Sequence, residues 1–63
     1  MNASPNLVTN VQRALNDAGF NPGPIDGILG RSTSKAIGEY QRANGLSSGQ
    51  LTIETLKKLG VNT

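Results

Sequence analysis

Residues 19–30 read GFNPGPIDGILG and separate two segments of helical periodicity. The stretch holds four glycines and two prolines, and such a composition interrupts helices and does not suit a strand. The sequence therefore predicts an all-α fold, a compact three-helix bundle in which a long structured loop connects the first two helices.

Two features of this loop predict how it is built. Asp26 followed by Gly27 is typical of a turn in which the carboxylate accepts backbone N–H groups. The loop also carries apolar side chains that a solvated connection does not need, and we expect them to fill the gap between the first two helices: Phe20, Ile25, Ile28 and Leu29.

Apolar residues recur at helical spacing in three segments, which predicts helices over residues 5–18, 31–44 and 53–59. Tyr40 falls on the inward face of the second segment, so we expect its ring in the core. Each segment ends in a glycine followed by an apolar residue, at 19–20, 45–46 and 60–61. Glycine adopts the left-handed conformation that closes a helix, and the next side chain folds back on the last turn.

The starts of the second and third helices share a spacing, because Gly27 precedes Thr33 by six residues and Gly49 precedes Thr55 by six. Thr52 is the expected N-cap of the third helix. The alignment favours Gly30 as the N-cap of the second, with Thr33 bonding back to the N-cap amide, and Ser32 is the alternative.

Composition excludes several classes of function. A chain of 63 residues forms one domain, and its net charge of +2 does not require an anionic polymer as partner. It has no cysteine and no histidine, so we expect no disulfide, no zinc site and no Ser/His or Cys/His catalysis. The loop offers only Asp26 where a calcium loop needs several oxygen ligands, and Gly27 and Gly30 are not followed by Gly-Lys-Ser/Thr, so we also expect no other metal site and no cofactor. No apolar run approaches the length of a membrane span, and no signal peptide is recognised within these residues.

The order of motifs resembles the small three-helix peptidoglycan-binding domain of bacterial and phage cell-wall hydrolases. The resemblance covers about residues 7–61, and it is carried by Ile25-Asp26-Gly27-Ile28-Leu29-Gly30-Arg31-Ser32-Thr33, Tyr40-Gln41, Asn44-Gly45-Leu46, and Thr55 with Leu56 and Leu59. Arg31 stands where the family often has proline, Tyr40 where it often has phenylalanine, and Leu56 where it frequently has an aromatic residue.

The resemblance implies a monomeric, non-catalytic module that binds peptidoglycan, through its stem peptide or its glycan, and targets an attached hydrolase or related protein to the wall. It implies an extracytoplasmic location at the cell wall, or delivery by a phage. The expected organisation is a disordered N-terminus (1–4), the domain (5–61) and a tail (62–63). Two alternatives stay open: a protein interaction module of a phage or secretion assembly, and a small helical DNA-binding domain. The connections are too long for a helix-turn-helix, so we expect no nucleic-acid partner.

Two surfaces are the candidate binding sites. One is a basic stripe on the second helix, formed by Arg31, Lys35 and Arg42 around Gly38; its alternative interpretation is an ordinary solvated face. The other is a cleft between the loop and the second helix, lined by Asn21, Asp26, Gln41 and Asn44, where Gln41 either contacts the ligand or ties down carbonyls of that loop. The candidate ligand-binding residues are Asn21, Asp26, Arg31, Lys35, Gln41 and Asn44.

Overall fold

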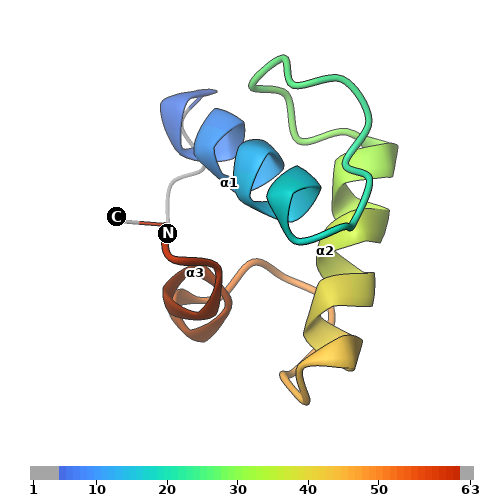
Figure 1. The fold of residues 1–63 in the computed structure, drawn as a ribbon, viewed down its shortest axis with the longest axis vertical. Coiled ribbons are helices and arrows are strands. Elements are labelled where there is room, and N and C mark those ends of the chain that lie inside the picture. Colours follow the sequence, from blue (N-terminus) through green and yellow to red (C-terminus); the bar gives the residue numbers. More distant parts are fainter. Residues whose placement is uncertain (1–4, 62–63) are drawn as a thin grey trace.

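The computed structural model describes residues 5–61, and these residues form three helices with two connections (Figure 1). The helices are α1 (Pro5–Asp17), α2 (Arg31–Ala43) and α3 (Ile53–Leu59). The predicted helices at 5–18, 31–44 and 53–59 are confirmed to within one residue at each end, and residues 5–61 contain no strand. The predicted disordered N-terminus (1–4) and tail (62–63) lie outside the described residues.

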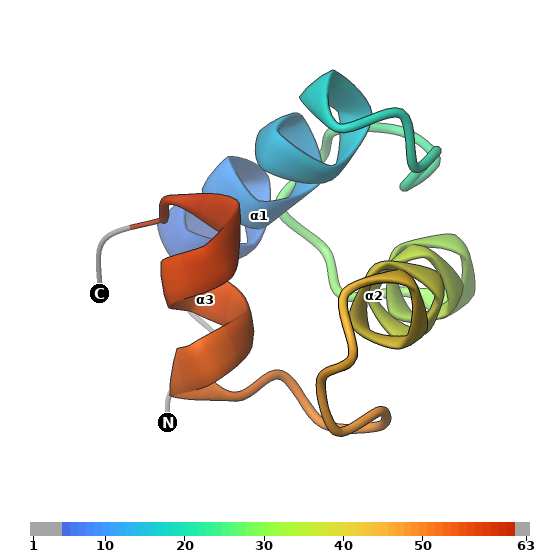
Figure 2. The same ribbon diagram turned by 60° about the horizontal axis from the view of Figure 1, so that its bottom comes forward.

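The three helices enclose one core. α1 packs against both α2 and α3, and the connection over residues 44–52 carries the chain from the end of α2 across to α3 (Figures 1 and 2). Leu15, Ala36 and Leu56, one from each helix, are fully buried at its centre. Tyr40 is buried as predicted, and its ring meets Phe20 edge-on with the centroids 5.4 Å apart.

All three helices end in the predicted manner. The glycines at 19, 45 and 60 have φ of 89°, 69° and 81°. The residue after each glycine donates its N–H to a carbonyl five residues back, over 2.8 Å from Phe20 to Leu15, 2.8 Å from Leu46 to Gln41 and 2.9 Å from Val61 to Leu56. These bonds satisfy carbonyls that would otherwise be unpaired at the helix ends.

The helix starts confirm both predicted N-caps and correct one predicted hydrogen bond. Thr52 caps α3, since its Oγ1 accepts the N–H of Thr55 at 3.2 Å. Gly30 is the N-cap of α2, so the alternative that placed Ser32 there is wrong. The expected bond from Thr33 back to the Gly30 amide is also wrong: that amide donates to Ile28, and Thr33 is turned inward.

The loop between α1 and α2 is not filled as expected. Phe20 does pack against the core, as predicted. Ile25, Ile28 and Leu29, however, are 44%, 64% and 44% exposed, so their predicted role as a plug is wrong. The space beneath the loop is taken instead by polar side chains of the two helices, because these can satisfy the loop's backbone groups and aliphatic side chains cannot.

Candidate functional site

Gln12 is the centre of the first connection. Its side chain is fully buried, and its Oε1 accepts the N–H of Gly27 at 3.0 Å. Its Nε2 lies 3.0 Å from Thr33 Oγ1 and 3.1 Å from the carbonyl of Ile28, both of which accept from it. Thr33 in turn donates to the carbonyl of Pro22 at 2.8 Å. One glutamine therefore fixes the loop to the beginning of α2.

Gln41 does the same for the second connection. It is fully buried; its Oε1 accepts the N–H of Gly49 at 3.0 Å, and its Nε2 donates to the carbonyl of Gln50 and to Thr55 Oγ1. The interpretation that Gln41 ties down carbonyls of the loop between α1 and α2 is wrong, because it ties down a carbonyl of the connection that leads to α3 instead. Asn44 lies nearby and donates from Nδ2 to the Tyr40 carbonyl at 2.9 Å.

Asp26 forms the predicted turn. Its Oδ1 accepts the N–H of Ile28 at 2.9 Å and the Nε2 of Gln12 at 3.2 Å. The backbone hydrogen bond from Ile28, followed by that from Gln12, lowers the pKa of the Asp26 carboxyl because both favour its charged form. Asn21 is likewise used within the loop, where its Oδ1 accepts the N–H of Gly23 at 3.0 Å.

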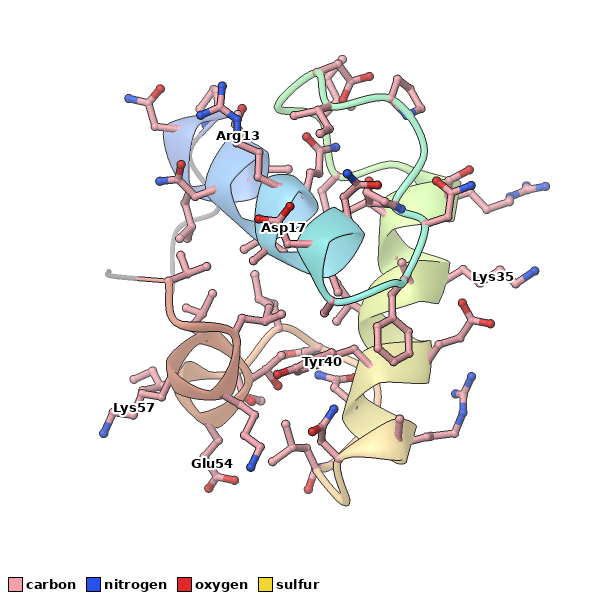
Figure 3. The ribbon with its side chains drawn as sticks, viewed as in Figure 1. Arg13, Asp17, Lys35, Tyr40, Glu54 and Lys57 are labelled. Atoms are coloured by element: carbon pink, nitrogen blue, oxygen red, sulfur yellow. The ribbon has the colours of Figure 1, made fainter. Side chains whose placement is uncertain are left out.

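Arg31 and Lys35 are exposed on the first half of α2, and Lys35 points away from α1 and α3 (Figure 3). Asp26 and Arg31 lie together at a hollow of about 180 Å³ beside the loop, whose walls also include Pro22, Pro24 and Ser32. The structure thus brings Asp26 and Arg31 to one hollow and leaves Gln41 and Asn44 at the other connection. The predicted cleft of Asn21, Asp26, Gln41 and Asn44 is therefore wrong, because Gln41 and Asn44 belong to the second connection.

A larger groove lies between α1 and α3, and the sequence analysis did not single out its residues. It has a volume of about 640 Å³. Its charged residues are Arg13 and Asp17 on α1 and Lys58 on α3, and Tyr40 also lines it. Figure 3 shows Arg13 and Asp17 on one side of α1 and Tyr40 reaching from α2 toward α3. The spacing of Arg13 and Asp17 by four residues was the available signal, since it puts them on one helix face.

The chemistry that these surfaces offer is hydrogen bonding and charge pairing. Among residues 5–61, no three acidic, cysteine or histidine side chains gather where they could hold a metal ion. In the same part of the chain, no helix has the length and apolarity needed to cross a membrane.

Comparison with known families gives one finding. A family model described as "Putative peptidoglycan binding domain" matches residues 4–59. Neither the curated proteins nor the solved structures contain a match.

Proposed function

The chain belongs to this family of peptidoglycan-binding domains, and we propose that it is a non-catalytic module that binds bacterial peptidoglycan and holds an attached hydrolase or related protein at the wall. The observation that carries the proposal is the extent of the family match, which leaves only a few residues at each end uncovered. The proposal includes a monomeric domain acting outside the cytoplasm, at the cell wall or delivered there by a phage.

The distribution of carboxylates supports a binding role. Hydrolysis of a glycosidic bond generally needs two carboxyl groups that flank it. Here Asp26 is engaged in its turn, and the other three acids, Asp17, Glu39 and Glu54, are exposed on α1, α2 and α3 respectively. No two of them share a helix, and the chain has no histidine or cysteine to act as a base or nucleophile.

For the binding surface we propose the beginning of α2 with the adjoining loop, composed of the exposed Arg31 and Lys35 of the helix and the exposed Asn21 and Asp26 of the loop. Arg31 is the first residue of α2, and the N-cap Gly30 supplies no side-chain hydrogen bond to the helix. An anionic group is favoured at such a helix start, next to a guanidinium. Gln41 and Asn44 act on this proposal as supports of the fold, not as ligand contacts.

The test is a sedimentation assay with insoluble peptidoglycan, run beside duplex DNA at two salt concentrations. We expect the protein to sediment with the wall material and not to be retained by DNA. Retention by DNA alone, falling steeply with salt, would instead identify a nucleic-acid binder. Arg31→Ala should weaken wall binding while circular dichroism stays unchanged, and Lys57→Ala, which removes an exposed cation of α3 outside this surface, is the control.

One observation favours a second candidate function. Ile25, Ile28 and Leu29 are exposed within five residues of the same loop, and exposed apolar side chains gathered in this way are typical of protein interfaces. A protein interaction module of a phage or secretion assembly would use this loop. The same sedimentation assay separates the two functions, because such a module would not sediment with the wall.

A further inference from the structure

The groove between α1 and α3 contains a buried side chain whose polar atom has no partner. Tyr40 is only 7% exposed, and its hydroxyl makes no hydrogen bond within the described part of the chain. That hydroxyl is not sealed in the core, because no buried side-chain oxygen or nitrogen among residues 5–61 lacks a partner. Tyr40 lines the groove and reaches from α2 toward α3, so its accessible hydroxyl is assigned to the groove. It is a fixed hydrogen-bond donor at the surface of a hollow.

The edges of the groove carry charges that the protein does not neutralise itself. Arg13 on α1 and Lys58 on α3 are exposed, and neither takes part in a hydrogen bond or an ion pair within residues 5–61. Asp17, one turn along α1 from Arg13, is likewise without such a partner in that range. Two cations and one carboxylate around a neutral donor favour a ligand that carries more negative than positive charge.

The size of the groove limits the class of ligand. Its volume of about 640 Å³ falls within the range of sites that take small molecules or short peptides. A guanidinium, an ammonium and a phenol are suitable donors for a carboxylate, whereas the hydroxyl and N-acetyl groups of a sugar chain give the two cations no charged partner.

We propose that this groove binds a short peptide through the free carboxylate of the peptide. Lys58, Arg13 and the Tyr40 hydroxyl donate hydrogen bonds to that carboxylate, and Asp17 accepts N–H groups of the same peptide. The proposal rests on the function proposed above, and within it assigns the groove to the stem peptide of peptidoglycan and not to the glycan. The site is separate from the surface at the start of α2.

The test is a titration followed by NMR or calorimetry, with three soluble probes: a stem tetrapeptide with a free terminal carboxylate, the same peptide as its C-terminal amide, and a peptide-free oligomer of N-acetylglucosamine. We expect the acid to bind with shifts at groove residues, and the amide to bind about two- to fivefold more weakly, as for the loss of one exposed charge pair. Binding of the sugar oligomer alone would overturn the proposal.

The matched variants are Lys58→Gln and Lys57→Gln, two adjacent lysines on α3 of which only Lys58 lines the groove. Lys58→Gln should raise the Kd for the acid peptide about two- to fivefold, and Lys57→Gln should leave it unchanged. Tyr40→Phe, which keeps the ring, should also raise it. Equal effects of both lysine variants would refute the groove as the site.

Sedimentation with whole peptidoglycan distinguishes the two proposals. If the unaltered protein does not bind the wall, the proposed function is wrong and the groove assignment is wrong with it. If it binds the wall but Lys58→Gln and Tyr40→Phe bind peptide and wall as well as it does, only the groove assignment is wrong.

Discussion

Gln12 and Gln41 hold the two connections of the domain with equivalent hydrogen bonds. Each side-chain oxygen accepts the N–H of a glycine at 3.0 Å, namely Gly27 or Gly49. Each Nε2 donates to the carbonyl of the residue after that glycine and to the Oγ1 of a buried threonine six residues after it. The spacing shared by the starts of α2 and α3 therefore reflects one structural unit that occurs twice.

Replacing either glutamine by methionine should destabilise the domain. Methionine keeps the approximate shape and removes both hydrogen-bonding groups, so Gln12→Met leaves the Gly27 N–H and Gln41→Met the Gly49 N–H without its partner. The expected loss is about 1–3 kcal/mol of the free energy of unfolding for each variant. Urea denaturation measures it, with the exposed Asn10→Ala as control; a loss below about 0.5 kcal/mol, as at ordinary surface sites, would contradict the assigned role.

Asp26 makes the stability of the loop depend on pH. Its pKa in the folded protein is lowered from the ordinary value of 3.8 by the hydrogen bonds from Ile28 and Gln12. The charged form therefore stabilises the folded state above about pH 3.8, and this contribution is lost as the pH falls further through the lowered pKa.

Asp26→Asn should reduce this acid dependence. The free energy of unfolding, measured by urea denaturation from pH 6 to pH 2.5, should fall less steeply with decreasing pH in the variant than in the unaltered protein. Glu39→Gln, which changes an exposed carboxyl on α2, is the control and should keep the slope. An unchanged slope in Asp26→Asn would show that its hydrogen bonds do not favour the charged form.

The helices could be predicted because their signals are local. The apolar spacing and the glycine that follows each helix predict the bounds of α1, α2 and α3 to within a residue, and Thr52 and Gly30 mark two of the helix starts. Each of these signals comes from residues that are close together in the chain: the glycine sets the local backbone conformation, and the apolar spacing describes one face of a single helix. The sequence of the segment alone therefore contains them.

The inside of the loop could not be predicted in the same way. Gln12 is polar and lies among helix residues, so nothing local shows that it is buried; its partners are 14 to 21 residues further along the chain. The three aliphatic residues of the loop suggested an apolar filling, yet the unpaired backbone groups of a loop require polar partners. The predicted cleft of Asn21, Asp26, Gln41 and Asn44 is wrong for the same reason, because the backbone groups of the second connection require Gln41 as their partner.

Phe20 and Ile28 should differ sharply in their importance for stability. Phe20 packs on the core and meets Tyr40 edge-on, whereas Ile28 is 64% exposed. Phe20→Ala should cost about 3 kcal/mol, near the lower limit for aromatic truncations because the ring is only half-buried. Ile28→Ser should stay within about 0.5 kcal/mol. Thermal and urea denaturation measure both losses. A large loss of unfolding free energy in Ile28→Ser would contradict the exposed position of Ile28 and support its packing between α1 and α2.

Gly27 has both a positive φ and close neighbours around the position of an added Cβ. Gly45 has a positive φ without such neighbours, and Gly30 has neither feature, so substitutions at the three glycines distinguish the two effects. Gly45 has φ +69° with open space around an added Cβ, so Gly45→Ala should cost about 1 kcal/mol from conformation alone. Gly27 has φ +75°, and an added Cβ would lie 2.9 Å from Thr9 Oγ1 and 3.1 Å from the Pro5 carbonyl oxygen. Gly27→Ala should therefore cost more than Gly45→Ala, because the start of α1 must also shift.

Gly30 has φ −94° and open space around an added Cβ, so a substitution there should stabilise the domain and not destabilise it. Gly30→Ser adds the side-chain cap that α2 lacks and restricts the unfolded chain, which together should raise the free energy of unfolding by about 0.5–1 kcal/mol. Urea denaturation of the three variants should then order them Gly30→Ser above the unaltered protein, Gly45→Ala below it and Gly27→Ala lowest. A Gly27→Ala loss no larger than that of Gly45→Ala would mean that the loop moves away from Pro5 without cost, and that Gln12 does not hold it rigidly.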